Sequence, residues 1–485
     1  MKKYYMFFGE GSKVNQIICA ILINLPVFVY GAAIGWMSPM TLLLQSKDSP
    51  TETPLTDTEV SWMAAVSYLV CVVFDFVMAF LCDRIGRKLT LIFMSAMGAV
   101  CWIIKLSSLS TWAFILARAA VGVTMAGAYV TCPLYTKEIS EDSIRGVLGT
   151  LVILFHTTGN LFLYVIGDYL SYHTILWVCL SLPTIHLVLF MMMPESPSFL
   201  VRSGKEEEAK RVLAWLRCRS EEDTEVRREL QVIKDEQTKD EKSSNFVLKA
   251  VLSDKILFRA FRIAMVATLS REVCGAIPVL NFAGDIFNMA SQGSGLQLTP
   301  NQQAMMLGAV QVAGSALASS IVEKTGRKPL LFSTSLVSGL SMCGLATYFL
   351  AKQLGFFAPD WLPIFTLCLC IFCDAAGLQP VSVILTSEIF SFKYRGTIMA
   401  TTMATASVAD FLQMLFFKPL ASIVGIHIAF YFFGFVCIIS SVYVLLVIPE
   451  TRSRSIEEIH LDLRTKKEKA LDDSANLKKI EALEA

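Results

Sequence analysis

Long apolar runs separated by short polar segments dominate the chain. Each of the twelve main runs has about 20 residues, the length that a helix needs to cross a hydrocarbon layer about 30 Å thick. Six runs precede a polar break and six follow it, near residues 15–38, 60–82, 89–108, 113–136, 146–168, 172–193, 262–285, 302–322, 329–351, 362–386, 397–418 and 427–448. The pattern predicts twelve transmembrane helices.

The polar break has the composition of surface helices. Glu206 and Lys210 stand four residues apart, a spacing at which opposite charges support a helix. Val212 and Leu213 belong to an apolar stripe that suits packing under a bundle. We therefore expect an all-α membrane protein in four parts, with an N-terminal six-helix half at 1–193, a cytosolic helical linker at 194–261, a C-terminal six-helix half at 262–448 and a cytosolic tail at 449–485.

Composition agrees with this fold class. Of 485 residues, 54% are hydrophobic and only 17% are charged, which argues against a soluble enzyme. The net charge of +1 shows no nucleic-acid footprint. Most of the 13 cysteines lie inside apolar runs, where a thiol behaves as a small hydrophobe. We expect no structural disulfide, no metal site and no cofactor.

Charge sets the expected orientation. With a cytosolic N-terminus, most Lys and Arg residues between the runs fall on the inner face, as the positive-inside rule requires. The outer segments carry four lysines, at Lys47, Lys105, Lys352 and Lys418. Both termini are then cytosolic, and the plasma membrane is the expected location.

An internal repeat relates the two sets of six runs. Residues 83–88 read Asp-Arg-Ile-Gly-Arg-Lys, and residues 323–328 read Glu-Lys-Thr-Gly-Arg-Lys. An acid followed seven residues later by Arg-Gly occurs at Glu138 and again at Glu388. Pro-Glu-Ser at 194–196 returns as Pro-Glu-Thr at 449–451. Three echoes at nearly one offset predict two parallel six-helix halves.

The repeated charges gather at the cytosolic ends of the spans. We expect them to pair across the inner face and to separate when that face opens, as a state-dependent latch. The alternative is that they only anchor helix ends and set the topology.

With these motifs the chain resembles the sugar porter family of the major facilitator superfamily, from the first span to Pro449-Glu450-Thr451. The resemblance implies two six-helix bundles around a central cavity, alternating access, and a sugar or polyol as substrate. It also implies an inner-gate charge network, formed by Asp83, Arg84, Arg87, Arg118, Glu138, Arg145, Glu195, Glu323, Arg327, Glu388, Arg395 and Glu450.

The family's sugar-binding positions are diverged. The amide of the fifth span is replaced by Ile153, the aromatic residue of the tenth by Val383, and the amide of the eleventh by Asp410. Gln311 keeps an uncharged amide in the eighth span. The candidate cavity residues are Ile153, His156, Asn160, Arg271, Glu272, Gln311, Val383 and Asp410.

Two groups of polar residues suggest how the cavity compensates. His156 and Asn160 lie on the helical face of Ile153 and can supply the missing hydrogen bonds, unless they are a bundle histidine and a packing amide. Arg271 is costly inside a membrane unless it is paired, so we expect it to pair with Glu272 or Asp410. Such a pair lines the cavity or joins the seventh span to the eleventh.

The leading function is facilitated diffusion of a hexose or a disaccharide such as trehalose. Proton-coupled family members carry an acid in the first span, where this chain has Ala32, although coupling through Glu272, His156 or Asp410 remains open. A carrier of a zwitterion or organic ion, and a sugar sensor without transport, are the alternatives. The sequence contains no nucleotide-binding loop and no catalytic constellation, so enzyme activity is not expected. Beyond the solute and the lipid bilayer, no obligate protein partner is evident.

Overall fold

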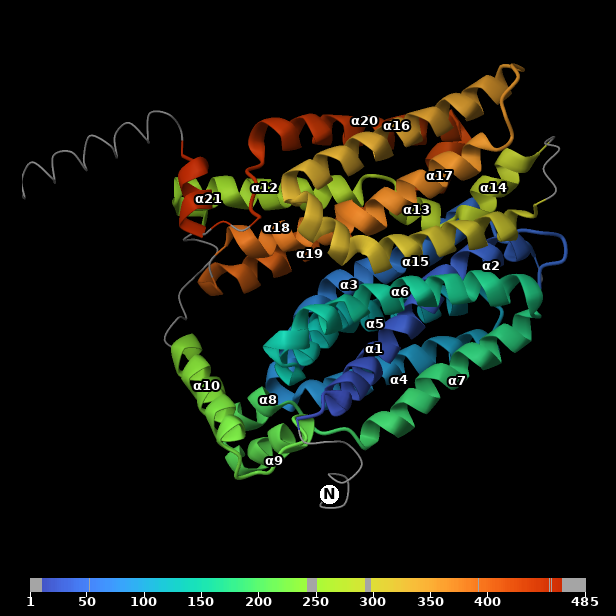
Figure 1. Cartoon of the computed structure of the whole chain (residues 1–485). Helices are drawn as coiled ribbons and strands as arrows, with labels where there is room; N and C mark the ends of the chain where they lie inside the picture. Colours follow the sequence, from blue (N-terminus) through green and yellow to red (C-terminus); the bar gives the residue numbers. More distant parts are fainter. Residues whose placement is uncertain are drawn as a thin grey trace, which may run out of the picture.

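The computed structural model describes residues 11–51, 53–241, 251–292, 298–390, 392–452, 454 and 456–464. Regular structure in these residues is helical throughout, and most helices run along one common direction in two layers (Figure 1). One layer holds the first helices of the chain and the other holds the last. The fold class expected from the sequence is confirmed.

The N-terminal half has six spans, the first of which is divided at Trp36 into α1 and α2. Its helices are α1 (Val14–Gly35), α2 (Met37–Leu44), α3 (Asp57–Ile85), α4 (Arg87–Ser107), α5 (Thr111–Ile139), α6 (Asp142–Tyr169) and α7 (Tyr172–Met191).

The C-terminal half repeats this order with two interrupted spans. Its helices are α12 (Lys255–Glu272), α13 (Ala276–Asn281), α14 (Ala283–Ser291), α15 (Pro300–Thr325), α16 (Arg327–Gln353), α17 (Leu362–Cys373), the π-helix η1 (Asp374–Leu378), α18 (Gln379–Ile389), α19 (Phe392–Val424) and α20 (Ile426–Val447).

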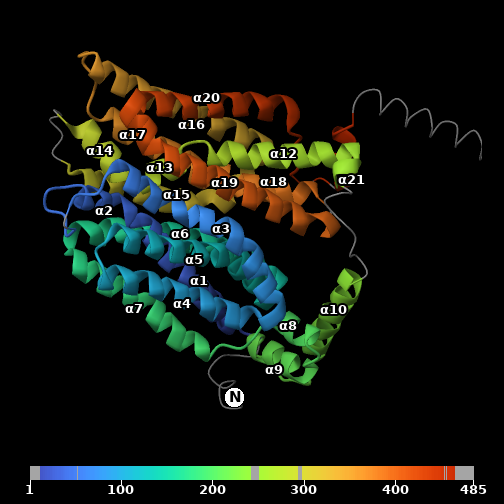
Figure 2. The same ribbon diagram turned by 180° about the vertical axis from the view of Figure 1, so that it is seen from behind.

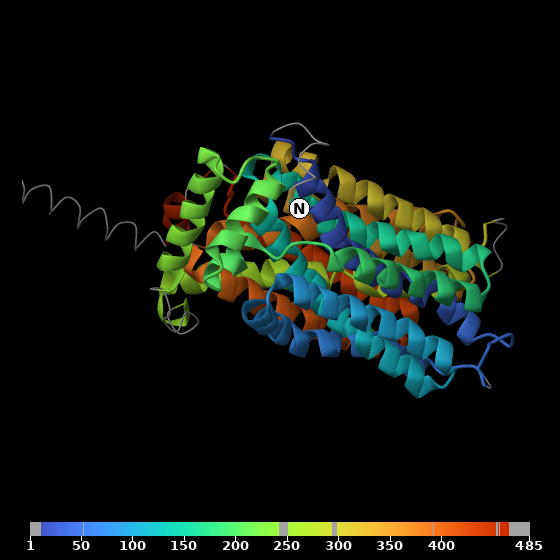
Figure 3. The same ribbon diagram turned by 90° about the horizontal axis from the view of Figure 1, so that it is seen from below.

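Short helices lie across one end of the bundle, as Figure 3 shows from below. They are α8 (Pro197–Arg202), α9 (Glu206–Leu216) and α10 (Thr224–Glu241), with α21 (Ile456–Asp462) beside the C-terminal half (Figure 1). The helices predicted for the linker are therefore present. We call this end of the bundle, where α3 passes into α4, the linker end, and the opposite end, where α4 passes into α5, the far end.

Eleven stretches among the described residues are long and apolar enough to cross a membrane. The remaining predicted span corresponds to α15, whose 26 residues reach about 39 Å at 1.5 Å per residue. Several Gln and Ser residues make α15 more polar, but it packs against α6, α14 and α17 inside the bundle. The twelve-span arrangement thus consists of eleven apolar spans and one polar span.

Two helix pairs make most of the contact between the halves, α3 with α19 and α6 with α15. The repeat makes α3 equivalent to α15 and α6 equivalent to α19, so the two contacts correspond to each other. The reverse view shows α3 against α19 along the same interface (Figure 2). The interface therefore has the approximate two-fold arrangement that the repeat predicts.

Two glycines make the repeated turns at the linker end possible. Gly86 has φ 97° and Gly326 has φ 92°, a backbone region that other residues rarely adopt. A Cβ on Gly86 would also lie 2.3 Å from a carboxylate oxygen of Glu195. Glycine at both positions thus fits the turn between α3 and α4 and the turn between α15 and α16.

Candidate functional site

Polar side chains of the two halves meet halfway along the spans. Asn160 of α6 donates from Nδ2 to Oε1 of Gln311 on α15 at 3.1 Å, and both residues are buried. Closer to the far end, Tyr164 donates to the Leu280 carbonyl oxygen at 2.5 Å. The Gly284 amide donates to Ser38 Oγ at 2.8 Å. Among the described residues, hydrogen bonds between the halves occur only at this middle level and toward the far end.

The seventh span is broken at the same level. Helix α12 ends at Glu272, Gly275 adopts φ 87°, and α13 begins at Ala276. A Cβ on Gly275 would lie 2.6 Å from the ring of Phe433, so a larger residue does not fit there. The break frees the Glu272 carbonyl oxygen, which accepts a hydrogen bond from Gln413 Nε2 at 3.0 Å. Broken helices in a membrane occur where the backbone is buried in protein or lines a cavity.

Arg271 occupies the end of α12 with two carboxylates. Its Nη1 lies 2.5 Å from Oε1 of Glu272, and its Nε lies 3.4 Å from Oδ1 of Asp374. The expected pair with Glu272 is thus present, whereas the second partner is Asp374 rather than Asp410. Asp374 begins η1, a π-helical stretch that precedes Pro380. A wide turn before a proline redirects side chains, and sequence spacing alone does not show it.

Asp410 belongs to the same cluster without an ion pair of its own. Its side chain is 4% exposed, and its Oδ1 accepts a hydrogen bond from Gln413 at 2.8 Å. The Asp410 and Glu272 carboxyls also lie within hydrogen-bonding reach. In the described part of the chain, no Lys or Arg nitrogen lies within 4.0 Å of the Asp410 carboxyl. The predicted Arg271–Asp410 pair is therefore not formed.

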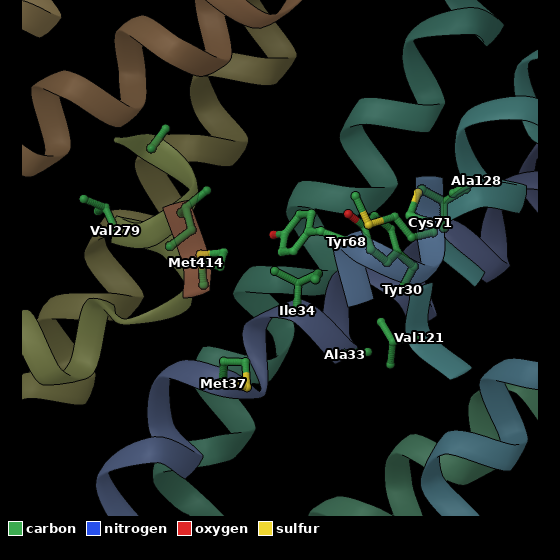
Figure 4. Close-up of a cluster of buried hydrophobic side chains, with 14 of the residues drawn as sticks. Tyr30, Ala33, Ile34, Met37, Tyr68, Cys71, Val121, Ala128, Val279 and Met414 are labelled. Atoms are coloured by element: carbon green, nitrogen blue, oxygen red, sulfur yellow. The ribbon is translucent and has the colours of Figure 1, made fainter. Parts of the chain in front are cut away.

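Aromatic side chains cover the facing wall of the N-terminal half. His156 stacks on Tyr30 with ring centroids 4.9 Å apart, and the Tyr30 and Tyr129 hydroxyls are 3.3 Å apart. Figure 4 shows Tyr68 extending from α3 toward Met414 of the other half. Its hydroxyl accepts a hydrogen bond from Asn281 Nδ2 at 3.3 Å. The sequence singled out His156, but not the three tyrosines.

Ile153 and Val383 contribute no hydrogen bond, as expected for apolar side chains at positions where the family has polar or aromatic ones. Both are half-buried. Val383 lies nine residues beyond Asp374, about 13 Å toward the linker end at 1.5 Å per residue. These two positions therefore flank the polar center rather than form it.

A separate charge network lies at the linker end of the N-terminal half. Arg87 binds Glu138 through two nitrogens, at 3.0 and 2.8 Å, and Ser196 also donates to Glu138. Glu195 accepts hydrogen bonds from the backbone N–H groups of Arg87 and Lys88. Asp83 pairs with Arg202 of α8 at 2.8 Å.

The C-terminal half repeats this network. Arg327 binds Glu388 and Glu323, at 2.8 and 3.0 Å, and Thr451 donates to Glu388 at 2.5 Å. Glu450 accepts from the backbone N–H groups of Arg327 and Lys328. Apart from the pair of Asp83 with Arg202 of the linker, these ion pairs lie within one half each, so in this conformation they hold helix ends in place and do not bridge the halves.

Glu195 and Glu450 occupy equivalent places but differ electrostatically. Burial raises the pKa of Glu195, and hydrogen bonds from three backbone N–H groups offset this only in part. Burial also acts against ionisation of Glu450, which is more exposed, but four backbone N–H groups outweigh it and lower the pKa of that carboxyl.

Three predicted members of the network lie elsewhere or have other partners. Arg118 is the clearest correction, since it lies in the far-end half of α5 and donates to the Met63 and Ala33 carbonyl oxygens. Arg84 is exposed and lies over the Phe80 ring. Arg145 is exposed and donates to the Ser140 carbonyl oxygen at 3.1 Å. The Arg395 side chain lies outside the described residues.

The reason for the Arg118 correction is chain direction. Helix α5 begins at the far end with Thr111 and reaches the linker end at Ile139, and Arg118 is only seven residues from its start. About 20 residues of helix, roughly 30 Å, separate it from Glu138.

The far end has a charged contact that the sequence did not reveal. Lys418 Nζ lies 2.5 Å from a carboxylate oxygen of Asp285 and 3.6 Å from Asp57. It also donates to Gln45 Oε1 at 2.6 Å. Because Asp57 and Gln45 belong to the N-terminal half, Lys418 ties the halves together at the end opposite the linker.

Comparisons with known proteins agree with this arrangement. Residues 17–463 match the family described as Sugar (and other) transporter. The chain is 26% identical over 447 residues to the facilitated trehalose transporter Tret1 of Polypedilum vanderplanki, which covers 92% of this chain and 87% of that protein. It is 27% identical over 466 residues to human solute carrier family 2, facilitated glucose transporter member 6, with 90% of this chain and 89% of that protein covered.

Among solved structures, the inward-open xylose transporter XylE of E. coli is similar to this one. The TM-score is 0.75 at 17% identity, with 92% of this chain and 99% of that chain covered. The partially occluded inward-open form of the same transporter gives a TM-score of 0.73 at 17% identity, with 91% of this chain and 100% of that chain covered. At this level of identity the likeness establishes the fold.

Proposed function

Because the chain belongs to the Sugar (and other) transporter family, we propose that it carries a hexose or a disaccharide such as trehalose across a membrane by facilitated diffusion. The single observation that supports this most is the Asn160–Gln311 hydrogen bond, which joins the halves at the middle of the bundle. Both side chains end in an amide group, which can donate hydrogen bonds to hydroxyl groups and accept hydrogen bonds from them.

The substrate site in this proposal consists of the polar groups at the middle level. Sugar hydroxyls need directional donors and acceptors, and the C–H face of a sugar ring needs an apolar wall. Asn160, Gln311 and Asn281 supply the amides, while Tyr30 and His156 supply an aromatic surface. A sugar that enters between the halves replaces the hydrogen bond between the Asn160 and Gln311 side chains that now joins them.

Transport in this proposal follows from the unequal closure of the two ends. Inter-half bonds hold the far end together, and none is present at the linker end among the described residues. The linker end is then the open side in this conformation. Rocking of the halves about the middle level exposes the same polar groups to the far end.

We further propose the orientation and the location of the carrier. The basic loops, α8–α10 and α21 share the linker end, so the positive-inside rule assigns that end to the cytosol. Both termini are then cytosolic, in the plasma membrane. Residues 1–193, 194–261, 262–448 and 449–485 serve as the N-terminal half, the linker, the C-terminal half and the tail.

The test is initial-rate uptake of labelled glucose and trehalose into cells with verified surface expression, with and without a proton ionophore. The expected result is saturable uptake of at least one sugar that survives the ionophore. Gln311→Ala should raise KM, because it removes an amide at the middle level. The matched control is Gln303→Ala on the same helix, whose buried amide bonds Ser291 and the Leu298 carbonyl within the C-terminal half.

Two results oppose the proposal. Sugar binding without flux, at normal surface expression, indicates a sensor. No uptake and no binding of either sugar indicates that the scaffold carries another class of solute. If both glutamine variants change KM equally, Gln311 is not part of the substrate site, whereas the proposed carrier function still stands.

A further inference from the structure

The middle of the C-terminal half has more negative than positive groups. Glu272, Asp374 and Asp410 gather around one cation, Arg271, and the three carboxyl-bearing residues are 2–4% exposed. In the described structure, the ion pairs of this cluster involve Arg271 alone. One guanidinium therefore faces three carboxyl groups.

An excess carboxylate inside a membrane protein is costly unless a cation compensates it. Arg271 binds Glu272 at 2.5 Å and Asp374 at 3.4 Å, which leaves Asp410 with the neutral donor Gln413. The Asp410 carboxyl also lies next to that of Glu272, so ionising both groups would bring two negative charges together. The position that lacks a positive charge is thus next to Asp410.

The unpaired polar atoms near this position are acceptors. Asn281 is 1% exposed, and its Oδ1 has no hydrogen-bond partner. Gln413 Oε1 is buried and likewise without a partner. The Asn281 side chain contacts the hydroxyl of Tyr68, which is close enough to Asp410 to feel its charge. Buried acceptors without donors are unfavourable, so the missing group is a hydrogen-bond donor.

Aromatic side chains face the cluster from the N-terminal half. The charge of Arg271 acts on Tyr129 and on His156, and Tyr30 contacts both of these residues. Tyrosine rings attract organic cations through their faces. Cys71 of α3 also lies toward Asp410, and its thiol is directed to Asp75 at 3.6 Å.

We propose that the transported solute carries an ammonium group and that Asp410, beside Glu272, binds it. This inference rests on the proposed sugar-carrier function and specifies the substrate as an amino sugar or a similar amino polyol. The ammonium supplies the missing positive charge and donates to the free oxygens of Asn281 and Gln413. The hydroxyl groups of the same solute use Asn160 and Gln311.

The experiment compares three sugars that share the same ring and differ in one substituent, namely glucosamine, glucose and N-acetylglucosamine. Uptake is measured at about pH 6.5, where an amine of ordinary pKa is largely protonated. A charged hydrogen bond at a buried site should favour glucosamine over N-acetylglucosamine by about tenfold or more in the ratio of maximal rate to KM. Glucosamine should also produce an inward current in voltage-clamped cells, whereas glucose should not.

Asp410→Asn tests the residue. This substitution keeps the shape of the side chain and removes its charge, so the ratio of glucosamine uptake to glucose uptake should fall about tenfold. The matched control is Asp75→Asn, which removes a carboxyl from α3 that bonds the Cys71 thiol. That variant should keep the ratio. Surface expression is measured for both variants, and the ratio corrects for any common loss.

The failures of the two proposals are distinguishable. Glucose uptake with no preference for glucosamine, or with a preference that Asp410→Asn leaves unchanged, overturns the ammonium site and retains the sugar carrier. Glucose uptake that an ionophore abolishes in the wild type but not in Asp410→Asn shows that the cluster binds a proton instead. No uptake of any of the three sugars, despite surface protein, contradicts the carrier function itself.

Discussion

Lys418 Nζ at the far end of α19 lies 3.6 Å from Oδ1 of Asp57 at the start of α3, and the two residues belong to different halves. The same ammonium lies 2.5 Å from Asp285, and both Lys418 and Asp285 are nearly buried. The repeated charges at the linker end, in contrast, pair within each half. The electrostatic closure between the halves in this conformation is therefore at the far end.

Removing Lys418 should open the far end. Lys418→Met leaves the buried Asp285 carboxyl without its cation. The loss of one partner of a buried pair typically costs about 3–5 kcal/mol. A cysteine at Ser38, which is 0% exposed and bonds Gly284, should then react faster with a membrane-impermeant maleimide from the far side.

The double variant Lys418→Met with Asp285→Asn is the control. It removes the unpaired buried carboxyl but still lacks the Lys418 contacts with Asp57 and Gln45, so its labelling should stay fast. Labelling of the Ser38→Cys protein that is equally slow with and without Lys418 would show that this lysine does not hold the far end closed.

Gly146, at the linker end of α6, should be essential for transport but not for folding. A Cβ at Gly146 meets no atom within 4 Å in this conformation. When the far end opens, the linker ends approach each other, and small residues allow helices to pack closely. Gly146→Leu should therefore reach the surface normally and show strongly reduced uptake.

A contrasting glycine on the same helix is Gly159, where a Cβ would lie 2.2 Å from the Phe28 carbonyl oxygen. Gly159→Ala should lower surface expression, since overpacking typically costs about 1–3 kcal/mol. Normal uptake by Gly146→Leu would indicate that this face stays apart from the other half throughout the cycle.

The pairing of Arg271 predicts which charge exchange the protein tolerates. Exchanging Arg271 with Asp374 keeps opposite charges in contact. Exchanging Arg271 with Asp410 does not, because the structure has no ion pair between these two positions. Arg271→Gln alone leaves two buried carboxylates without a cation, at a cost of about 3–5 kcal/mol.

Fluorescence-detected size-exclusion chromatography of the detergent extract measures the folded fraction. The Arg271–Asp374 exchange should retain more folded protein than the Arg271–Asp410 exchange or Arg271→Gln. The reverse order would contradict the pairing described above.

The equivalent residues Glu195 and Glu450 should affect stability with opposite dependence on pH. The pKa of Glu195 is raised by burial, so its contribution to folding is largest below its ordinary pKa of 4.5 and is lost as the pH rises through its folded-state pKa. Backbone hydrogen bonds outweigh burial and lower the pKa of Glu450, so its contribution is present above 4.5 and is lost as the pH falls through its folded-state pKa.

Thermal unfolding of Glu195→Gln and Glu450→Gln in detergent, from pH 4 to 7.5, measures this. Relative to the wild type, Glu195→Gln should become more favourable as the pH rises, and Glu450→Gln should become less favourable. Parallel pH profiles of the two variants would contradict the assigned difference.

The sequence predicted the spans and the linker helices because hydropathy reports directly on the length of each apolar run. It also predicted the repeat, since an echo such as Glu138 and Glu388 needs only a count along the chain. In α15 the buried Gln311 adds polarity, yet the apolar run at 302–322 was long enough to predict this span as well.

The candidate site was predicted in part. Arg271 and Glu272 are adjacent in sequence, and their pairing was correctly inferred from the cost of an unpaired ion in a membrane. Asp374 replaced Asp410 as the second partner because the π-helical turn before Pro380 changes the direction of its side chain. Arg118 was assigned to the wrong end, because family motifs do not state the depth of a residue in a span.

The sequence by itself determined the number of spans, their grouping in two halves and the clustering of charge at one end, because these properties depend on local composition and on spacing. Only the tertiary structure decided which charges meet, since Lys418, Asp57 and Asp285 come from three separate spans. It likewise decided that the one cation in the center pairs with only two of the three carboxyl groups there. Such contacts depend on how helices rotate and cross, and hydropathy carries no record of either.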